Sequence, residues 1–140
     1  MGIQNRNLTV DAKLRHFLTP TAVAVDLDAT GASYVPSLYN ATRKITIVEA
    51  YFELTVATVD VTGSPKALIG IAGDTDKYGS YTFVDSDAIG FKQLTLTTNA
   101  KEIAAATRII CSHEDVGTSV GEGYFHIWYY LGDYQPNRLE

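Results

Sequence analysis

The sequence predicts an all-β protein, an antiparallel sandwich or barrel of about eight strands. Apolar and polar residues alternate with a period of two over most apolar segments, and β-branched residues dominate these segments. Turn-forming residues separate the segments at short intervals, as in the stretches 62–65, 73–76, 85–87 and 117–123. These observations favour many short strands over βαβ units.

Eight segments of the chain have this strand pattern. They are residues 8–10, 21–27, 45–59, 67–72, 81–84, 93–97, 108–112 and 124–131. With 140 residues the chain is expected to form one domain. We assign residues 1–20 to an N-terminal arm or first strand, residues 21–132 to the sandwich and residues 133–140 to a C-terminal tail.

The segment 45–59 shows most clearly which side chains face the core and which face water. Val48, Ala50, Phe52, Leu54 and Val56 are predicted to face the core, and Glu49, Tyr51, Glu53 and Thr55 to face water. Fifteen residues at about 3.3 Å each would extend about 50 Å, which is long for one strand of a sandwich. We therefore expect a bend or bulge, or a strand shared between two sheets.

The segment 99–107 is the single helical candidate. Asn99 is placed as an N-cap, and three alanines follow it. Nine residues make a marginal helix, so we expect one or two turns or an ordered loop.

The segment 124–131 is the most aromatic part of the chain. Phe125, Ile127, Tyr129 and Leu131 are predicted to share one face, and Tyr124, His126, Trp128 and Tyr130 the other. Bulky residues on both faces indicate a central strand, or a strand with one face on a partner. Tyr124, Trp128 and Tyr130 are the candidate interface residues, because Tyr and Trp anchor interfaces. Core packing under a loop and sugar stacking are the alternatives.

The charge and hydropathy of the chain exclude several classes of protein. The net charge of −5 argues against a nucleic-acid-binding protein, which needs a basic patch. No window approaches the roughly 20 apolar residues of a membrane span. The first residues also lack the apolar core of a secretory signal, so we expect synthesis in a cytoplasm and no membrane partner.

The segment 67–81, ALIGIAGDTDKYGSY, comes closest to a site. Asp74 and Asp76 resemble the start of a calcium loop, but the closing Glu at the twelfth position is missing. We interpret Gly-Asp-Thr-Asp as a turn in which Asp side chains bond to nearby backbone. An ion held together with Asp85 and Asp87 is the alternative, if their two loops meet.

Catalytic motifs are weak in this sequence. Cys111 and His113 are predicted to share a strand face, but nothing nearby suggests a third, orienting group. His16, His113 and His126 occur singly, outside any metal or hydrolase motif. We expect no enzyme activity, cofactor or metal. An enzyme would be favoured by a pocket holding two histidines and a carboxylate.

The order of these pieces is similar to a known family. An apolar strand and a Gly-Ser-Pro turn are followed by Leu-Ile-Gly-Ile-Ala-Gly-Asp-Thr-Asp-Lys-Tyr, a Leu-Thr-Leu strand, an alanine-rich turn and an aromatic strand. These pieces are residues 45–56, 63–65, 68–78, 94–96, 103–107 and 124–130. The layout resembles the small β-sandwich proteins of tailed-bacteriophage heads called decoration, cement or head-fibre proteins. The likeness covers about residues 41–131.

The resemblance implies a jelly-roll-like sandwich that binds the major capsid protein on the outside of a capsid. It also implies a homotrimer on the virion surface that stabilises the particle without catalysis. Residues 1–19 have no counterpart in the pattern, so no role is carried over to them. A carbohydrate-binding β-sandwich module is the alternative function, because it shares the acidic balance and the aromatic residues.

Overall fold

The computed structural model describes residues 13–19, 25–26, 33–59, 61, 65–114 and 120–132. The predicted strand 8–10, most of the N-terminal arm and the tail 133–140 lie outside the described residues.

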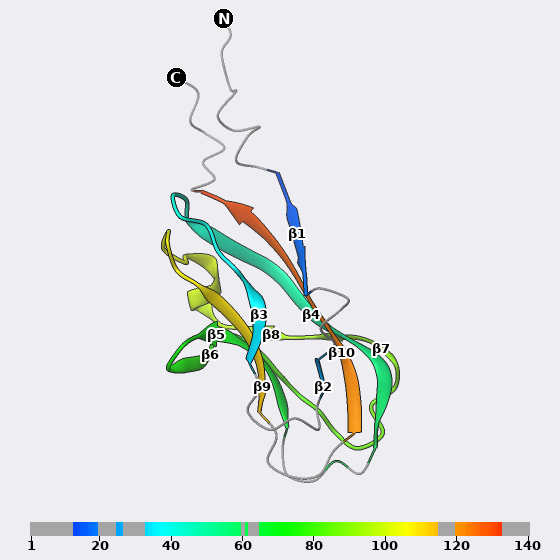
Figure 1. Ribbon diagram of the computed structural model, residues 1–140. Coiled ribbons are helices and arrows are strands. Elements are labelled where there is room, and N and C mark those ends of the chain that lie inside the picture. Colours follow the sequence, from blue (N-terminus) through cyan, green and yellow to red (C-terminus); the bar gives the residue numbers. More distant parts are fainter. Residues whose placement is uncertain are drawn as a thin grey trace, which may run out of the picture.

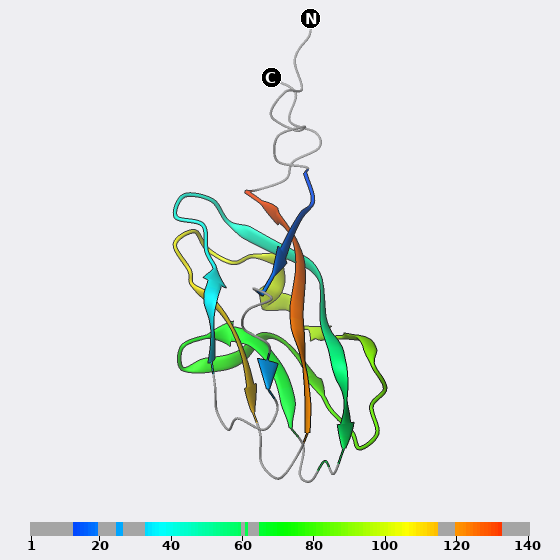
Figure 2. The same cartoon turned by 45° about the vertical axis from the view of Figure 1, so that its right-hand side comes forward.

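Two antiparallel sheets pack face to face as the layers of a sandwich (Figures 1 and 2). Sheet A consists of β1 (Arg15–Leu18), β2 (Val25–Asp26), β4 (Ile45–Val59), β7 (Gly90–Gln93) and β10 (Val120–Leu131). Sheet B consists of β3 (Ser33–Leu38), β5 (Lys66–Ile71), β6 (Asp74–Thr82), β8 (Thr95–Leu96) and β9 (Ile109–Glu114). A short 3-10 helix, η1 (Thr98–Lys101), follows β8.

The strand order is jelly-roll-like, which confirms the expected fold class. Sheet A runs β1-β10-β4-β7, with β2 also paired to β10, and sheet B runs β3-β9-β5-β6-β8. β2 and β8 have only two residues each. If β1 and β2 are taken as one strand and β8 is left out, every connection except the β5–β6 hairpin crosses between the sheets. This repeated crossing is the jelly-roll arrangement.

The core lies between the sheets and is centred on Phe52. Its ring meets the rings of Phe83 and Phe125 edge-on, at centroid distances of 5.2 and 5.1 Å. All three side chains are fully buried. Edge-to-face packing of this kind adds to the free energy gained by burying the rings.

The facing predicted for β4 is confirmed in its middle and wrong near its ends. Ala50, Phe52 and Leu54 are fully buried, but Val48 and Val56 are 43% and 39% exposed. The reason is the expected bulge, which changes the direction in which a side chain points.

The pairing of β4 with β10 locates these irregularities. Trp128 lies opposite Glu49, but the next residue of β10 lies opposite Ile47, so Val48 is the extra residue. A second register shift occurs around Gly123, where the backbones come very close. A Cβ atom at Gly123 would collide with the carbonyl oxygen of Glu53. Only glycine permits this approach of the two central strands.

The expectation of one or two turns or an ordered loop in the segment 99–107 is confirmed, because a single 3-10 turn, η1, is followed by a loop. Thr97, not Asn99, is the N-cap residue, and Ile103 forms an isolated bridge with Ile45. The two residues exchange backbone hydrogen bonds of 2.9 and 3.0 Å, which hold this part of the chain against β4. Tertiary pairing therefore overrides a weak helical propensity.

Other strands differ from the prediction at their ends. The strand expected at 81–84 is instead β6, which begins at Asp74, and the segment 93–97 is divided between β7 in sheet A and β8 in sheet B. β3 was not predicted at all, and β1 was covered only by the assignment of residues 1–20 to an arm or first strand. β3 contains Pro36, which an edge strand tolerates because one side of its backbone needs no partner.

Candidate functional site

The exposed side of sheet A carries most of the polar and aromatic chemistry of the described chain. We call it the outer face and define it by outward side chains of four strands. These are His16 of β1, Glu49, Tyr51 and Glu53 of β4, Phe91 of β7, and Tyr124, His126, Trp128 and Tyr130 of β10.

The central strand of this face is β10, as predicted. It lies between β1 and β4, and its alternating residues point inward, where Phe125 and Ile127 are fully buried. The three candidate interface residues, Tyr124, Trp128 and Tyr130, lie on the opposite side and are half-buried.

Strand register places carboxylates beside rings on this face. Glu53 lies opposite Phe91 of β7 and opposite Tyr124 of β10, so it has an aromatic neighbour on each side. Glu49 lies opposite Trp128. Directly opposed residues of an antiparallel pair have Cβ atoms about 4.5–5.5 Å apart, so each pair forms one local surface.

The rings of the outer face pack against one another. His16 stacks on Trp128 at 4.3 Å with an interplanar angle of 17°, and Tyr51 meets Trp128 at 5.8 Å and 89°. Tyr51 also meets Phe91 at 5.9 Å and 85°. Neighbouring rings restrict the rotamers of one another, so the cluster has a defined shape before any partner binds.

Two histidines and a carboxylate form a hydrogen-bonded chain across three strands. His16 Nε2 lies 2.9 Å from His126 Nδ1, and His126 Nε2 lies 2.8 Å from Glu53 Oε1. With both imidazoles neutral, His126 donates to the carboxylate and accepts from His16. The order is linear, because His126 uses both ring nitrogens within the chain. The three groups therefore do not converge on a common point where an ion could bind.

The sequence did not predict this meeting, because 110 residues separate the two histidines. It lies on one face of sheet A. A pocket of about 160 Å³ lies between β4, β8 and η1, and neither histidine nor carboxylate lines it. Within the described ranges, no group of three His, Cys, Asp or Glu residues is suited to hold a metal ion.

The hydrogen bonds among His16, His126 and Glu53 are expected to make the stability of the folded protein depend on pH. Burial, and next the charge of His126, lower the pKa of His16 from its usual 6.5. The unfolded state thus takes up this proton at a higher pH than the folded state does. The stability that depends on neutral His16 is present above pH 6.5 and lost as pH falls below it.

We expect urea unfolding to show this loss between pH 7.5 and 5.5, and to show less of it in His16→Gln. Because both proteins share every other titratable group, the difference between them reports His16 alone. The effect is small, since the His16 side chain is only partly desolvated and remains largely exposed. Equal losses in both proteins would contradict the assignment.

Cys111 and His113 do lie on one strand, β9, but both are buried. Burial raises the pKa of the Cys111 thiol to about 12. The thiolate, which is the reactive form, is therefore absent near neutral pH.

We expect Cys111 in the folded protein to resist a disulfide-exchange reagent at pH 8 and to react fully in denaturing urea. Absorbance of the released thiolate measures both. Reaction of the folded protein on the time scale of a free thiol would show that the side chain is accessible.

The Asp-rich segment is not a metal loop. Gly73, with φ of 89°, forms the turn between β5 and β6, while Asp74 and Asp76 already lie in β6. The predicted turn 73–76 was therefore placed too late in the chain. Asp85 and Asp87 follow the opposite end of this nine-residue strand, which extends about 26 Å from Asp74 to Thr82. The two Asp pairs cannot form one site.

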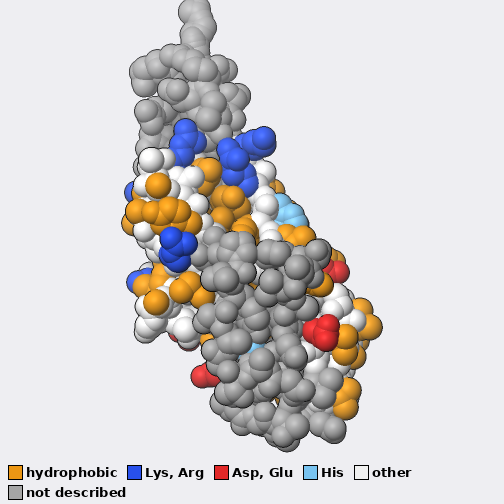
Figure 3. All heavy atoms as spheres, in the orientation of Figure 1, with side chains coloured by type: hydrophobic (Ala, Val, Ile, Leu, Met, Phe, Trp, Pro, Cys, Tyr) orange, Lys and Arg blue, Asp and Glu red, His pale blue; other side chains and the backbone are white. Residues whose placement is uncertain are grey.

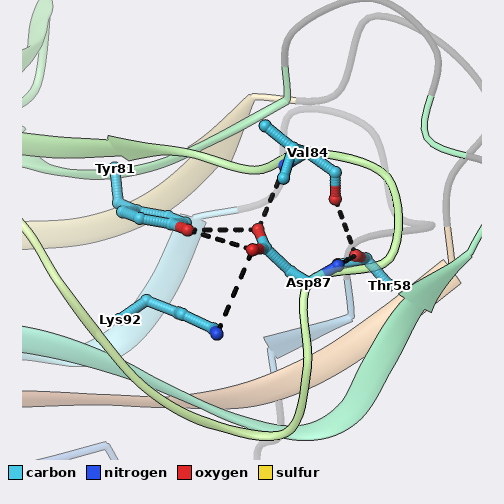
Figure 4. A network of polar contacts seen from close by, with 5 residues as sticks. All are labelled: Thr58, Tyr81, Val84, Asp87 and Lys92. Carbon is cyan, nitrogen blue, oxygen red and sulfur yellow. Dashed lines mark hydrogen bonds and ion pairs between the residues drawn. The ribbon is translucent and has the colours of Figure 1, made fainter.

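Asp87 instead organises the loop between β6 and β7 (Figure 4). Its carboxylate accepts hydrogen bonds from Tyr81 Oη at 3.2 Å and from the Val84 N–H at 3.0 Å, and Lys92 Nζ lies 4.0 Å away. Thr58 of β4 accepts a bond from the Asp87 N–H at 2.7 Å. The loop is thereby attached to both sheets.

The Tyr81 hydroxyl remains a donor in this network. Burial, and next the negative charge of Asp87, raise the pKa of Tyr81 above its usual 10. The sequence did not distinguish buried Asp87 from exposed Asp85, because both occur in one polar turn.

Comparisons with known proteins suggest no function for this chain, so its function is inferred from the sequence and the structure. No protein-family model, curated protein or solved structure matches this chain. Among the described residues, no helix is long and apolar enough to cross a bilayer.

Proposed function

We propose that this chain is a non-catalytic structural protein that binds the outer surface of a bacteriophage capsid and stabilises it. The capsid is inferred from the resemblance of residues 41–131 to head decoration proteins. The observation that supports a binding role is the outer face, where half-buried Tyr124, Trp128 and Tyr130 lie on one central strand.

The outer face has the properties of a protein-binding surface. Trp and Tyr supply large contact areas with few rotatable bonds, and they are enriched among residues that dominate binding energy. The rings here already pack on one another, so little conformational entropy remains to be lost on binding.

We further propose that the protein acts as a homotrimer on the major capsid protein. Three linked copies bind more tightly than one, because each contact after the first is effectively intramolecular. Light scattering on the purified protein tests the assembly directly. A mass of one chain at all concentrations would contradict the trimer and leave capsid binding to be tested separately.

Mixing the protein with undecorated capsids and imaging the particles tests capsid binding. We expect density on the capsid exterior, lost in Trp128→Ala. Tyr39→Ala is the matched control, because Tyr39 is 43% exposed and packs under Arg108, outside the outer face. Clean particles at micromolar wild-type protein would refute the proposal. Retained binding by a destabilised Trp128→Ala protein would show that Trp128 is a packing residue and not a contact.

Carbohydrate binding is the second candidate, and the exposure of Phe91 favours it. This ring is 56% exposed and lies beside Glu53, a combination that can stack on a sugar and accept its hydroxyl hydrogens. Against it, His16 covers one face of Trp128. Calorimetry with polysaccharides distinguishes the two functions, and heat at millimolar or tighter affinity would favour a glycan.

A further inference from the structure

We propose that the outer face binds an arginine-bearing segment of its protein partner. This inference rests on the proposed binding role and names the chemistry of the partner. It is carried by three features of the face: its charge, the placement of its carboxylates and the aromatic rings beside them.

The charge of the outer face is negative. The outward residues of β10 from Glu122 to Tyr130 and of β4 from Glu49 to Thr55 include Glu but neither Lys nor Arg. Lys92 of β7 turns the other way, toward buried Asp87. In Figure 3 the visible basic side chains gather toward the end where β1 begins and β10 ends. A cationic partner therefore meets complementary charge on this face.

The carboxylate of Glu53 is oriented but not saturated. His126 Nε2 binds Oε1 at 2.8 Å, and the side chain remains 35% exposed. Glu49 is likewise held by the Tyr51 hydroxyl, at 3.3 Å from Oε1. A carboxylate has about four acceptor positions, so each retains room for further donors. Two fixed carboxylates on one strand thus present unused acceptors outward.

The rings beside these carboxylates select the guanidinium group. Glu53 lies between Phe91 and Tyr124, and Glu49 lies beside Trp128. A guanidinium is planar and weakly hydrated, and it pairs with a carboxylate through two parallel bonds while stacking on a ring. Lysine offers a compact, strongly hydrated charge that gains less from such a surface. The face therefore fits arginine better than lysine.

The protonation state of His16 is part of this match. His16 is linked to Glu53 through His126, and its ring stacks on Trp128. Tyr51 of β4 lies opposite His126, and Phe91 of β7 meets the His126 ring. Burial, and next the charge of His126, lower the pKa of His16 from its usual 6.5. A protonated His16 would repel a guanidinium, so binding is expected to weaken as the pH falls below 6.5.

A peptide titration tests the inference without knowledge of the partner. The probe is an octapeptide of alternating arginine and glycine, and Trp128, the only tryptophan of the chain, reports binding by its fluorescence. We expect saturable binding of the arginine peptide, weaker binding of a lysine peptide and none of a citrulline peptide. Equal binding of arginine and citrulline peptides, or no change up to millimolar peptide, would overturn the inference.

Two charge-matched variants separate a site from general attraction. Glu53→Gln keeps the size and the acceptor for His126, whereas Glu102→Gln removes an exposed carboxylate that pairs with Lys44. Each changes the net charge by the same amount. We expect the dissociation constant to rise roughly tenfold in Glu53→Gln and to stay within twofold in Glu102→Gln. Equal effects of the two substitutions would overturn the inference.

The capsid experiment distinguishes this failure from failure of the proposed function. If wild-type protein and Glu53→Gln decorate capsids equally well, capsid binding stands and the arginine site is refuted. If the peptide binds in a Glu53-dependent way but capsids remain bare, the site stands and its partner is another protein. If Glu53→Gln changes the oligomeric state instead, the face joins copies of this chain and the inference fails.

Discussion

Replacing Phe52 with alanine is expected to lower the free energy of unfolding by about 3–5 kcal/mol, the usual cost of removing a buried ring. Phe52 is fully buried at the centre of the core, and its ring contacts both Phe83 and Phe125. Phe125 belongs to β10 of sheet A and Phe83 directly follows β6 of sheet B, so these two rings cannot both move in to close a cavity between the sheets. Urea unfolding followed by circular dichroism measures the change.

Val56→Ala is the control for this substitution. Val56 lies on the same strand, but its side chain is 39% exposed, so the expected change is within about 1 kcal/mol. A loss in Phe52→Ala as small as in the control would mean that the core rearranges to fill the space. It would also mean that the direction in which a β4 side chain points does not determine how much that side chain contributes to stability.

Replacing Asp87 with alanine is expected to cost about 1–3 kcal/mol, because two part-buried donors lose the buried carboxylate that accepts their hydrogen bonds. These are the Tyr81 hydroxyl and the Val84 N–H, while Lys92 loses its neighbouring charge. Thermal or urea unfolding measures the loss. Asp85→Ala, two residues away and exposed, is expected to change stability by about 0.5 kcal/mol or less.

A double-mutant cycle with Tyr81→Phe tests whether the network of Asp87 acts as described. Because the two side chains bond directly, the effects of the single substitutions are expected not to add, with a coupling of about 1 kcal/mol. Strict additivity would show that the hydroxyl and the carboxylate contribute independently. The cost of Asp87→Ala would then come from the loop backbone alone.

The sequence was sufficient to predict strands and their faces where the alternation of apolar and polar residues agrees with the observed burial. The bounds predicted for the strand 45–59 match β4, and both faces predicted for Tyr124–Leu131 are observed in β10. In these segments the residues that face the core are large and apolar, so the period-two signal is strong. The buried face of β10 also identified its reverse side as the place to look for a binding surface.

The parts of the fold and of the site that the sequence did not predict depend on contacts between residues far apart in the chain. β1 is short and rich in polar residues, and it is recognisable as a strand only through its pairing with β10. That same pairing brings His16 to His126, so the hydrogen-bonded chain had no local signature. The exposure of Val48 followed from a bulge, whose position depends on how two strands fit and not on either sequence alone.

The position of β10 has a consequence for the order in which the protein folds. β10 is the last described strand in the chain, yet it is the one that joins β1 and β2 to β4. Until it has been synthesised, the strands that flank it expose unpaired backbone and the apolar residues of half the core. Most of sheet A therefore assembles only after β10 has been synthesised, through pairings of high contact order that form slowly. Nascent chains in this interval would depend on chaperones more than the finished protein does.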